Sequence, residues 1–280
     1  MVIPKQNEMF DHFFKEYNSA DTVRKYTKST AGYGVNYLLL NDYAKVHMEA
    51  FKSCLARRKS SGIRVLEFGC GAGMNLIGLV QLLRKQRIDL EKAYGTDFSP
   101  ILIEIAGREG KESLPLADLE RIRFYVAKNE TLLDDLSIAS GEAISDLLES
   151  FDLILGVNTF RYCHRLGKSR ECAYDVFRLL RKGGVCIMID MNRRFPLFRS
   201  KLKGSGGNPA SSYLPSLAEY AAPFIHVGFE ILKKDNFCWV PHSAGPALVS
   251  FCRALSPVLN LTVRKFAMRS LVIARKPLES

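Results

Sequence analysis

A glycine-rich turn and two nearby acidic residues are the first candidates for chemistry in this 280-residue sequence. Residues 67–73 read EFGCGAG and follow a short apolar run that begins at Ile63. Glycine lets a backbone turn tightly and approach a ligand where a Cβ would clash. A helix that starts after such a turn offers unpaired N–H groups at its first residues. We therefore expect a nucleotide-binding turn that begins at Glu67, with a second carboxylate, Asp97, at the end of the next apolar run.

The spacing of the glycines distinguishes two kinds of nucleotide turn. A dinucleotide site has the pattern G-x-G-x-x-G after its strand. Here the third glycine comes one residue early, at Gly73, and Met74 stands where the dinucleotide pattern needs glycine. The pattern E-x-G-x-G-x-G instead resembles motif I of class I methyltransferases. A nicotinamide oxidoreductase is therefore disfavoured.

Three further segments resemble motifs of the same family and come in the family's order. Residues 94–100, YGTDFSP, are similar to the second-strand motif, which ends in an acid. Residues 151–155, FDLIL, resemble the fourth strand, and residues 179–185, LLRKGGV, resemble the helix, turn and strand that follow. The resemblance extends from residue 63 to about residue 192. It implies S-adenosyl-L-methionine as the cofactor and methyl transfer as the activity.

The resemblance also implies which residues bind the cofactor. Glu67 and the glycine turn would lie near its methionine part, and Asp97 would bind both ribose hydroxyls through charge-assisted hydrogen bonds. Where the family usually has an acid after the third strand, this chain has Asn129, whose amide oxygen can accept from the adenine amine. Two alternatives stay open: Glu67 as a strand-end carboxylate that caps backbone amides, and Asp97 as an acid favoured by a helix dipole. The candidate cofactor-binding residues are Glu67, Gly69, Cys70, Gly71, Gly73, Asn75, Asp97, Phe98, Asn129 and Asn158.

Alternating strands and helices must position these residues. Apolar runs predict strands at residues 63–68, 93–97, 122–127, 151–157, 185–191, 229–240 and 270–276. Helical spacing predicts helices at residues 74–84, 99–106, 171–182, with glycines at 183–184 as its stop, and 215–228. This order predicts an α/β fold with a seven-stranded, mostly parallel sheet flanked by helices.

Two regions extend this core. Residues 1–62 predict a helical lid that caps the acceptor, because apolar residues recur at helical spacing at positions 9–17 and again at 37–55. Residues 63–280 form the cofactor-binding domain, with insertions at 193–214 and 244–267. The second insertion is apolar and is predicted to be helical, with a break at Pro257.

Methyl transfer needs little catalytic apparatus in the sequence. The cofactor is already activated, so the protein mainly positions the reactants and excludes water. A base is needed only if the acceptor must lose a proton. The candidates are His164, Asp190 and His242, although a lone histidine is more often a hydrogen-bonded structural residue. No metal is expected, because the histidines are scattered and no ligand spacing occurs.

The acceptor is expected to be a small molecule. Arginine suits phosphate or carboxylate, and the apolar insertion can roof a pocket, form a contact in a homodimer or lie on a membrane surface. These features indicate an amphiphilic acceptor with an anionic group, such as a prenyl, lipid or polyketide-like metabolite. The candidate acceptor-binding residues are Tyr33, Tyr37, Arg161, Tyr162, Arg193, Arg194 and Trp239.

The charge balance leaves other functions open. The formal net charge is +11, and residues 236–278 contain no acid, which suits an anionic partner. Nucleic-acid methylation, for instance of RNA, is the alternative enzyme, but residues 158–161 read NTFR and lack the Asn/Asp-Pro-Pro-aromatic run of amino-methylating DNA enzymes. A module that binds cofactor without catalysis is a third possibility. Seven cysteines without a C-x-x-C pair and a polar start favour a reducing, cytoplasmic location.

Overall fold

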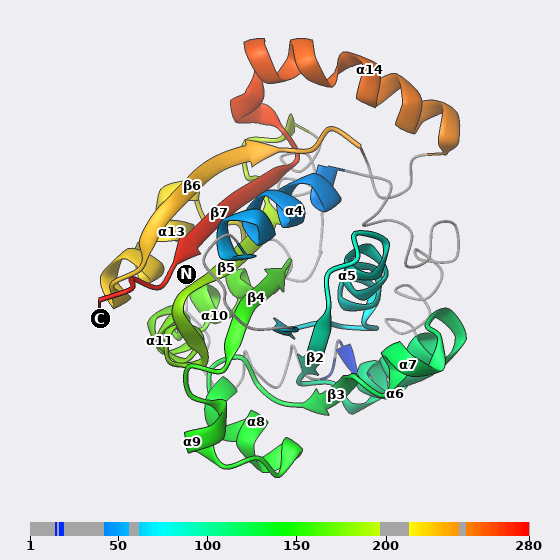
Figure 1. The fold of residues 1–280 in the computed structure, drawn as a ribbon. Coiled ribbons are helices and arrows are strands. Elements are labelled where there is room, and N and C mark those ends of the chain that lie inside the picture. The colour runs from blue at the N-terminus through cyan, green and yellow to red at the C-terminus, as the bar shows by residue number, and fades with distance from the viewer. Residues whose placement is uncertain are drawn as a thin grey trace.

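A seven-stranded sheet with the strand order β3-β2-β1-β4-β5-β7-β6 forms the centre of the computed structural model (Figure 1). The structure describes residues 15, 17–19, 42–55, 62–196, 213–240 and 245–279. The strands are β1 Ile63–Phe68, β2 Leu90–Asp97, β3 Ile122–Val126, β4 Phe151–Val157, β5 Leu180–Met191, β6 Glu230–Phe237 and β7 Arg269–Arg275. The first five strands pair in parallel, whereas β7 is antiparallel to both β5 and β6. The prediction of a mostly parallel seven-stranded α/β sheet is confirmed.

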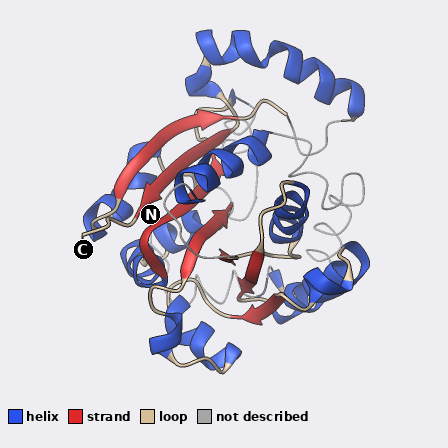
Figure 2. Ribbon diagram, viewed as in Figure 1, coloured by secondary structure: helices blue, strands red, loops and turns tan. Residues whose placement is uncertain are grey.

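Helices cover both faces of this sheet (Figure 2). On one face lie α4 Asp42–Leu55 and α5 Met74–Lys85, with α6 Pro100–Ser113 beside α5. On the other face lie α8 Leu132–Ser140, α9 Ile144–Leu147, α10 Phe160–Arg165, α11 Ser169–Leu179 and α13 Leu217–Val227. The remaining helical elements are α7 Leu116–Leu119, α14 Pro246–Thr262 and the short η2 Arg264–Phe266. The sequence analysis did not predict the short helices α7 to α10.

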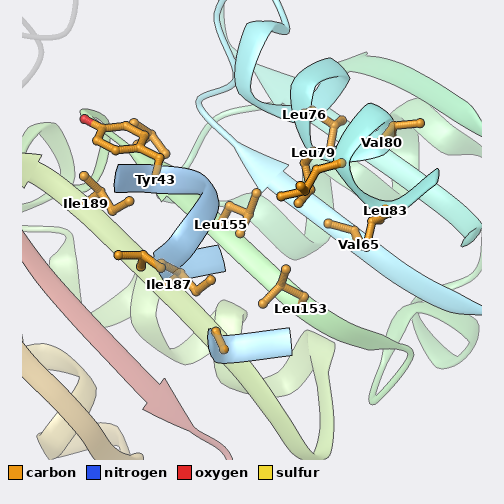
Figure 3. Packing of buried hydrophobic residues seen from close by; sticks show 14 of the residues in the cluster. Tyr43, Val65, Leu76, Leu79, Val80, Leu83, Leu153, Leu155, Ile187 and Ile189 are labelled. Atoms are coloured by element: carbon orange, nitrogen blue, oxygen red, sulfur yellow. The ribbon is translucent and has the colours of Figure 1, made fainter. Parts of the chain in front are cut away.

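The central strands are apolar throughout because both of their faces are buried. In β4, Leu153 and Leu155 pack with α4 and α5, whereas Ile154 points into the cluster on the opposite face. Figure 3 shows the first of these clusters, in which Tyr43 of α4 lies beside Ile189 of β5, and Val65 of β1 lies beside residues of α5. Alternation of side chains across a strand requires this division. The two cores hold the carboxyl ends of β1, β2, β4 and β5 together at one edge of the sheet.

Several predicted bounds are wrong, since β2 begins at Leu90 rather than at residue 93 and α6 runs to Ser113 rather than to residue 106. The helix predicted at 171–182 ends at Leu179, and β5 already begins at Leu180, whose extended backbone ends the helix before the glycines are reached. The apolar insertion does not break at Pro257, since α14 runs through it. Proline leaves the carbonyl four residues earlier without its helical donor, but α14 is largely exposed, so water can take that place.

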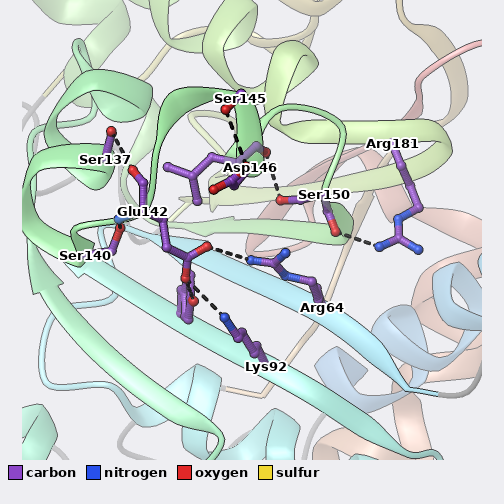
Figure 4. A network of polar contacts seen from close by, with 11 residues as sticks. Arg64, Lys92, Ser137, Ser140, Glu142, Ser145, Asp146, Ser150 and Arg181 are labelled. Atoms are coloured by element: carbon purple, nitrogen blue, oxygen red, sulfur yellow. Dashed lines mark hydrogen bonds and ion pairs between the residues drawn. The ribbon is translucent and has the colours of Figure 1, made fainter.

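A polar network closes the opposite, amino-terminal edge of the sheet (Figure 4). Glu142, in the loop between α8 and α9, accepts hydrogen bonds from Arg64 of β1 at 3.2 Å, from Lys92 of β2 at 3.2 Å and from the Tyr94 hydroxyl. Burial acts to raise the pKa of Glu142, but these donors outweigh it and hold the pKa below its ordinary value. The network ties the α8–α9 loop to β1 and β2, at the end of the sheet away from the glycine turn.

Candidate functional site

The glycine turn after β1 leaves open space at only one of its three glycines. All three have positive φ angles, of 61° at Gly69, 54° at Gly71 and 78° at Gly73. A Cβ at Gly69 would lie 1.9 Å from Thr159 Oγ1, and one at Gly73 would lie 2.9 Å from Ala106 Cβ. A Cβ at Gly71 would meet no atom of the described residues within 4 Å. Gly69 and Gly73 therefore allow close packing of the chain itself, while the space beside Gly71 is available to a ligand.

Asp97 fixes this turn from the end of β2. Its Oδ2 accepts a hydrogen bond from the Gly71 N–H at 2.9 Å, and its Oδ1 accepts one from the Ser99 N–H at 2.9 Å. Burial raises the pKa of Asp97 to about 6, although both N–H donors favour the ionised form. A carboxylate has about four acceptor sites. The two bonds to the backbone therefore leave Asp97 able to accept from ribose hydroxyls as well.

Glu67 carries an unsatisfied carboxylate oxygen at the end of β1. The side chain is fully buried, and its Oε1 accepts a hydrogen bond from Asn75 Nδ2 at 3.1 Å. Within the described residues, Oε2 has no hydrogen-bond partner. Burial raises the pKa of Glu67 to about 8, against the opposing effects of Asn75 and of the Leu76 backbone, and the nearby charge of Asp97 adds to the rise. A buried polar atom without a partner is rare in native proteins, and a cationic ligand group would satisfy this one.

Cys70 lies in the same turn but is not a nucleophile. Its thiol is buried and donates a weak hydrogen bond to the Gly71 carbonyl at 3.6 Å. Burial, together with the carboxylates of Asp97 and Glu67, holds the pKa of this thiol well above its ordinary value. Because a thiolate is the reactive form, the residue supplies shape rather than chemistry.

The loop after β4 closes over the turn. Thr159 Oγ1, which limits the space at Gly69, accepts a hydrogen bond from Asn129 Nδ2 at 2.8 Å. The amide oxygen of Asn129, which the prediction assigns to the adenine amine, is not the atom that Thr159 engages. Asn158 has a φ of 57°, and its Oδ1 accepts a hydrogen bond from Arg269 Nη1 of β7 at 2.8 Å. The side chain of Asn158 is therefore held toward β7.

Sequence reasoning missed a tyrosine of the N-terminal segment. The ring of Tyr17 packs edge-on against Phe98, which follows β2, with ring centres 5.8 Å apart. It packs in the same way against Tyr162 of α10 at 5.9 Å, and the two hydroxyls share a hydrogen bond. The Tyr17 carbonyl also accepts from Ser99 Oγ at 3.0 Å. Tyr17 therefore links the ends of β2 and β4; its place on the apolar face at residues 9–17 was the available signal.

Arg161 and Asp190 form a buried ion pair on the β4–β5 side. Arg161 Nη1 lies 3.4 Å from Asp190 Oδ1, and the Arg161 backbone N–H donates to Asp190 Oδ2 at 3.3 Å. Arg161 Nη2 donates to the Tyr162 hydroxyl at 2.8 Å, and within the described residues Nε has no partner. Burial disfavours both charges, yet Asp190 keeps the pKa of Arg161 above its ordinary value. Burial likewise raises the pKa of Asp190, although Arg161 opposes this. The pair is neutral as a whole, and it fixes the position of a guanidinium on the β4–β5 side of the turn.

The structure does not bring the other candidates to this pair. His164 Nδ1 hydrogen-bonds the hydroxyl of Tyr213, just before α13, and burial lowers the pKa of His164 despite the nearby Glu219. Arg193 and Arg194 are exposed, and Arg193 pairs with Glu219 at 3.3 Å. Trp239 Nε1 donates to Asn260 of α14 at 2.8 Å. The remaining candidates, Tyr33, Tyr37 and His242, lie outside the described residues.

The site fits S-adenosyl-L-methionine on its own chemistry. The cofactor carries a positive sulfonium and ammonium, which match the unpartnered oxygen of Glu67, and its ribose diol matches Asp97 beside the open space at Gly71. Within the described chain, no group of three or more His, Cys, Asp or Glu residues is arranged to hold a metal ion. The fold and the site thus define a nucleotide-binding enzyme whose turn suits a cationic ligand.

Comparison with known proteins identifies the family. A family model described as a methyltransferase domain matches residues 59–235. The chain belongs to this family and is a class I S-adenosylmethionine-dependent methyltransferase. When bound, S-adenosyl-L-methionine supplies a methyl group that needs no further activation, so the chain's own residues have to bind, orient and exclude water.

The individual relatives are more distant. A 3-methylorcinaldehyde synthase from Phoma sp. is 28% identical over 159 residues, which is 55% of this chain but only 5% of that protein's length. A phosphoethanolamine N-methyltransferase 2 from Haemonchus contortus, solved with S-adenosyl-L-methionine, has a TM-score of 0.58 at 15% identity and covers 99% of this chain and 60% of its own. The CMeT domain of the citrinin polyketide synthase has a TM-score of 0.57 at 17% identity, with 94% and 58% covered. These structures show the fold alone.

Proposed function

We propose that this enzyme methylates an amphiphilic small molecule and that Arg161 binds an anionic group of that acceptor. The observation that carries the proposal is the buried Arg161–Asp190 pair at the carboxyl edge of the sheet, whose guanidinium has one N–H without a partner in the described residues. The names of two similar proteins are consistent with a small-molecule acceptor, since one is named for the synthesis of 3-methylorcinaldehyde and the other for phosphoethanolamine.

The cofactor and the acceptor bind at different strands along the carboxyl edge of the sheet. Glu67 and Asp97 hold the cofactor at β1 and β2, while Asp190 orients Arg161 so that its charge faces the acceptor. A guanidinium can bind a carboxylate or phosphate through paired N–H donors. Asp190 accepts from both Arg161 and the Met191 N–H at 2.8 Å, so we assign it to positioning rather than to proton removal. Tyr17 and Tyr162 exclude water above the glycine turn.

The test measures methyl transfer to a panel of acceptors. The panel contains a phosphorylated amine, aromatic and β-keto acids of the polyketide type, and a neutral ester or alcohol analogue of each. We expect turnover with anionic acceptors and a KM about 10- to 150-fold higher in Arg161→Met, the scale of one lost charged hydrogen bond. The cofactor Kd should not change. Arg108→Met, which removes an exposed arginine of α6, is the matched control.

Removing Arg161 alone strands a buried carboxylate, so a second variant guards against misfolding. The double variant Arg161→Met with Asp190→Asn removes both charges and leaves no unpaired ion. It should fold, bind cofactor and lose the preference for anionic acceptors. Turnover of neutral acceptors only, or an unchanged KM in the double variant, would reject the proposal. Cofactor binding without turnover of any acceptor, including RNA, would favour a non-catalytic module, and turnover of RNA alone would favour nucleic-acid methylation.

We also propose that the enzyme works in the cytoplasm. The six cysteines that the structure describes are free thiols, and five of them are buried. Buried free thiols suit a reducing compartment. Fractionation of cells that express the tagged chain would test this, and recovery from the secreted fraction would contradict it.

A further inference from the structure

Helix α14 leaves an apolar face uncovered. Leu248, Phe251, Leu255, Val258 and Leu261 recur at spacings of three and four residues, so they share one side of the helix. Their exposed fractions range from 39% at Leu255 to 88% at Leu261. The neighbouring side of the helix is anchored, because Val249 and Cys252 pack against the core of the protein. Figure 1 shows α14 at the top of the view, outside the layers of helices that cover the sheet.

An exposed face of this kind calls for a partner. Single apolar residues are ordinary on a protein surface, but contiguous apolar patches mark contact sites. A surface helix normally turns charged residues to solvent. In α14 the only charged residue is Arg253. The outward side of the helix therefore matches an apolar environment better than it matches water.

The charges around α14 indicate which partner. Residues 236–278 contain six basic residues and no acid. Arg264 is engaged by Asp235, but Arg253 and Lys265 are exposed, and neither has an ion pair with another described residue. An apolar helix face accompanied by two exposed cations, neither of which is paired with a described acid, is complementary to a bilayer with anionic headgroups. No described helix is long and apolar enough to cross a membrane.

We propose that α14 docks this enzyme on the surface of an anionic lipid bilayer. The helix would lie in the plane of the interface with its five apolar side chains at the acyl boundary and with Arg253 and Lys265 near the headgroups. The single tryptophan of the chain, Trp239, lies on the other side of α14, because its Nε1 donates to Asn260, which is about 180° around the helix from Phe251. This docking is independent of which acceptor the enzyme methylates.

Vesicle binding by the full chain tests the proposal. We would compare vesicles of phosphatidylcholine alone with an equimolar mixture of phosphatidylcholine and phosphatidylglycerol by co-sedimentation. We expect binding to the mixed vesicles that weakens as the salt concentration rises. The double variant Phe251→Ser with Val258→Ser should bind at least about tenfold more weakly, since each apolar side chain contributes to transfer. The control Ile138→Ser removes an apolar residue that is 82% exposed on α8.

Each other outcome overturns the proposal. Equal binding of the double variant and the wild type would show that α14 does not contact lipid. Equal binding to the two kinds of vesicle would show that anionic headgroups are not recognised. A concentration-dependent dimer in light scattering that the double variant abolishes, with no vesicle binding, would assign the face to a second copy of this chain. Because vesicle binding is measured without an acceptor, its failure is distinguishable from failure of the proposed methyl transfer.

Discussion

The carboxyl of Glu67 should make cofactor affinity depend on pH. In the free protein burial raises its pKa to about 8, so the group is mostly protonated at neutral pH. The cationic cofactor should prefer the ionised form, since Oε2 is the buried oxygen that has no partner among the described residues. Binding should therefore release a proton near neutral pH and strengthen as the pH rises. The perturbation is Glu67→Gln, which keeps the shape and the acceptor for Asn75 but cannot ionise.

The size of the effect follows from the two pKa values. If only the ionised form binds, a group with a pKa of about 8 is half ionised at about pH 8 and roughly 1% ionised at about pH 6, so the Kd rises about 50-fold between them. Asp97, with a pKa of about 6, adds about twofold over the same range. The wild type should thus lose about 100-fold in affinity and Glu67→Gln only about twofold.

Calorimetry in two buffers of different ionisation enthalpy measures both the Kd and the protons released. The wild type should release close to one proton per cofactor at about pH 7, and Glu67→Gln almost none. Glu112→Gln, an exposed carboxylate on α6, is the matched control and should behave as the wild type does. A flat Kd between these pH values, or the same slope in Glu67→Gln, would refute the assigned contact.

The stability of the free protein gives an independent check on the pKa itself. The folded state holds the Glu67 proton more tightly than the unfolded state does, between the ordinary pKa of 4.5 and about 8. The free energy of unfolding should therefore fall as the pH rises through this window, and it should fall less in Glu67→Gln. A stability slope without an affinity slope would mean that the pKa is raised but that Glu67 does not contact the cofactor.

Three further predictions concern the same edge of the sheet. Asp97→Ala should weaken cofactor binding by about 1–3 kcal/mol, the scale of lost charged hydrogen bonds, and unchanged affinity in a folded variant would count against a ribose contact. Tyr17→Phe removes the hydroxyl bridge to the tyrosine of α10 and should speed cofactor dissociation several-fold in stopped-flow measurements, whereas an unchanged rate would show that the bridge does not close the site. Gly69→Ala should lower the free energy of unfolding in denaturant by more than about 1–3 kcal/mol, because its Cβ would lie 1.9 Å from Thr159 Oγ1. Gly141→Ala, also at a positive φ but with nothing within 4 Å of its Cβ, should cost less and controls for the backbone term.

The sequence predicts best those elements whose burial is uniform. The bounds of β1 and β4 match their predictions because both are short apolar runs between polar or glycine residues. The start of β5 at Leu180 was not visible, since residues 180–184 carry charges and glycines that a strand tolerates only where it pairs, as Leu180 does with Phe151. Strand propensity therefore predicts the start of a strand poorly where pairing with a neighbouring strand determines it.

The candidate site likewise contains contacts that the sequence predicts and contacts that it does not. Glu67, Gly71 and Asp97 were predicted as neighbours because their motifs lie at adjacent strand ends, and Gly71 and Asp97 do share a hydrogen bond. The pairing of Arg161 with Asp190 was not predicted, although each was a candidate alone. Two residues that lie 29 positions apart can pair without any effect on the local sequence pattern around either of them, so the pattern does not predict the contact.

The charged groups at this edge of the sheet favour one placement of the cofactor and the acceptor. The β1 and β2 ends hold two buried carboxylates, and the β4 and β5 ends hold a buried guanidinium that is paired with the carboxylate of Asp190. These sides are adjacent, since β1 pairs with β4 and Thr159, two residues before Arg161, limits the space at Gly69. A cationic cofactor is therefore drawn to Glu67 and an anionic acceptor to Arg161, in a buried setting where such interactions are strong. Methyl transfer removes the positive charge of the sulfonium. The demethylated cofactor therefore loses part of its attraction to Glu67. We infer that this loss of attraction assists release of the demethylated cofactor after each reaction.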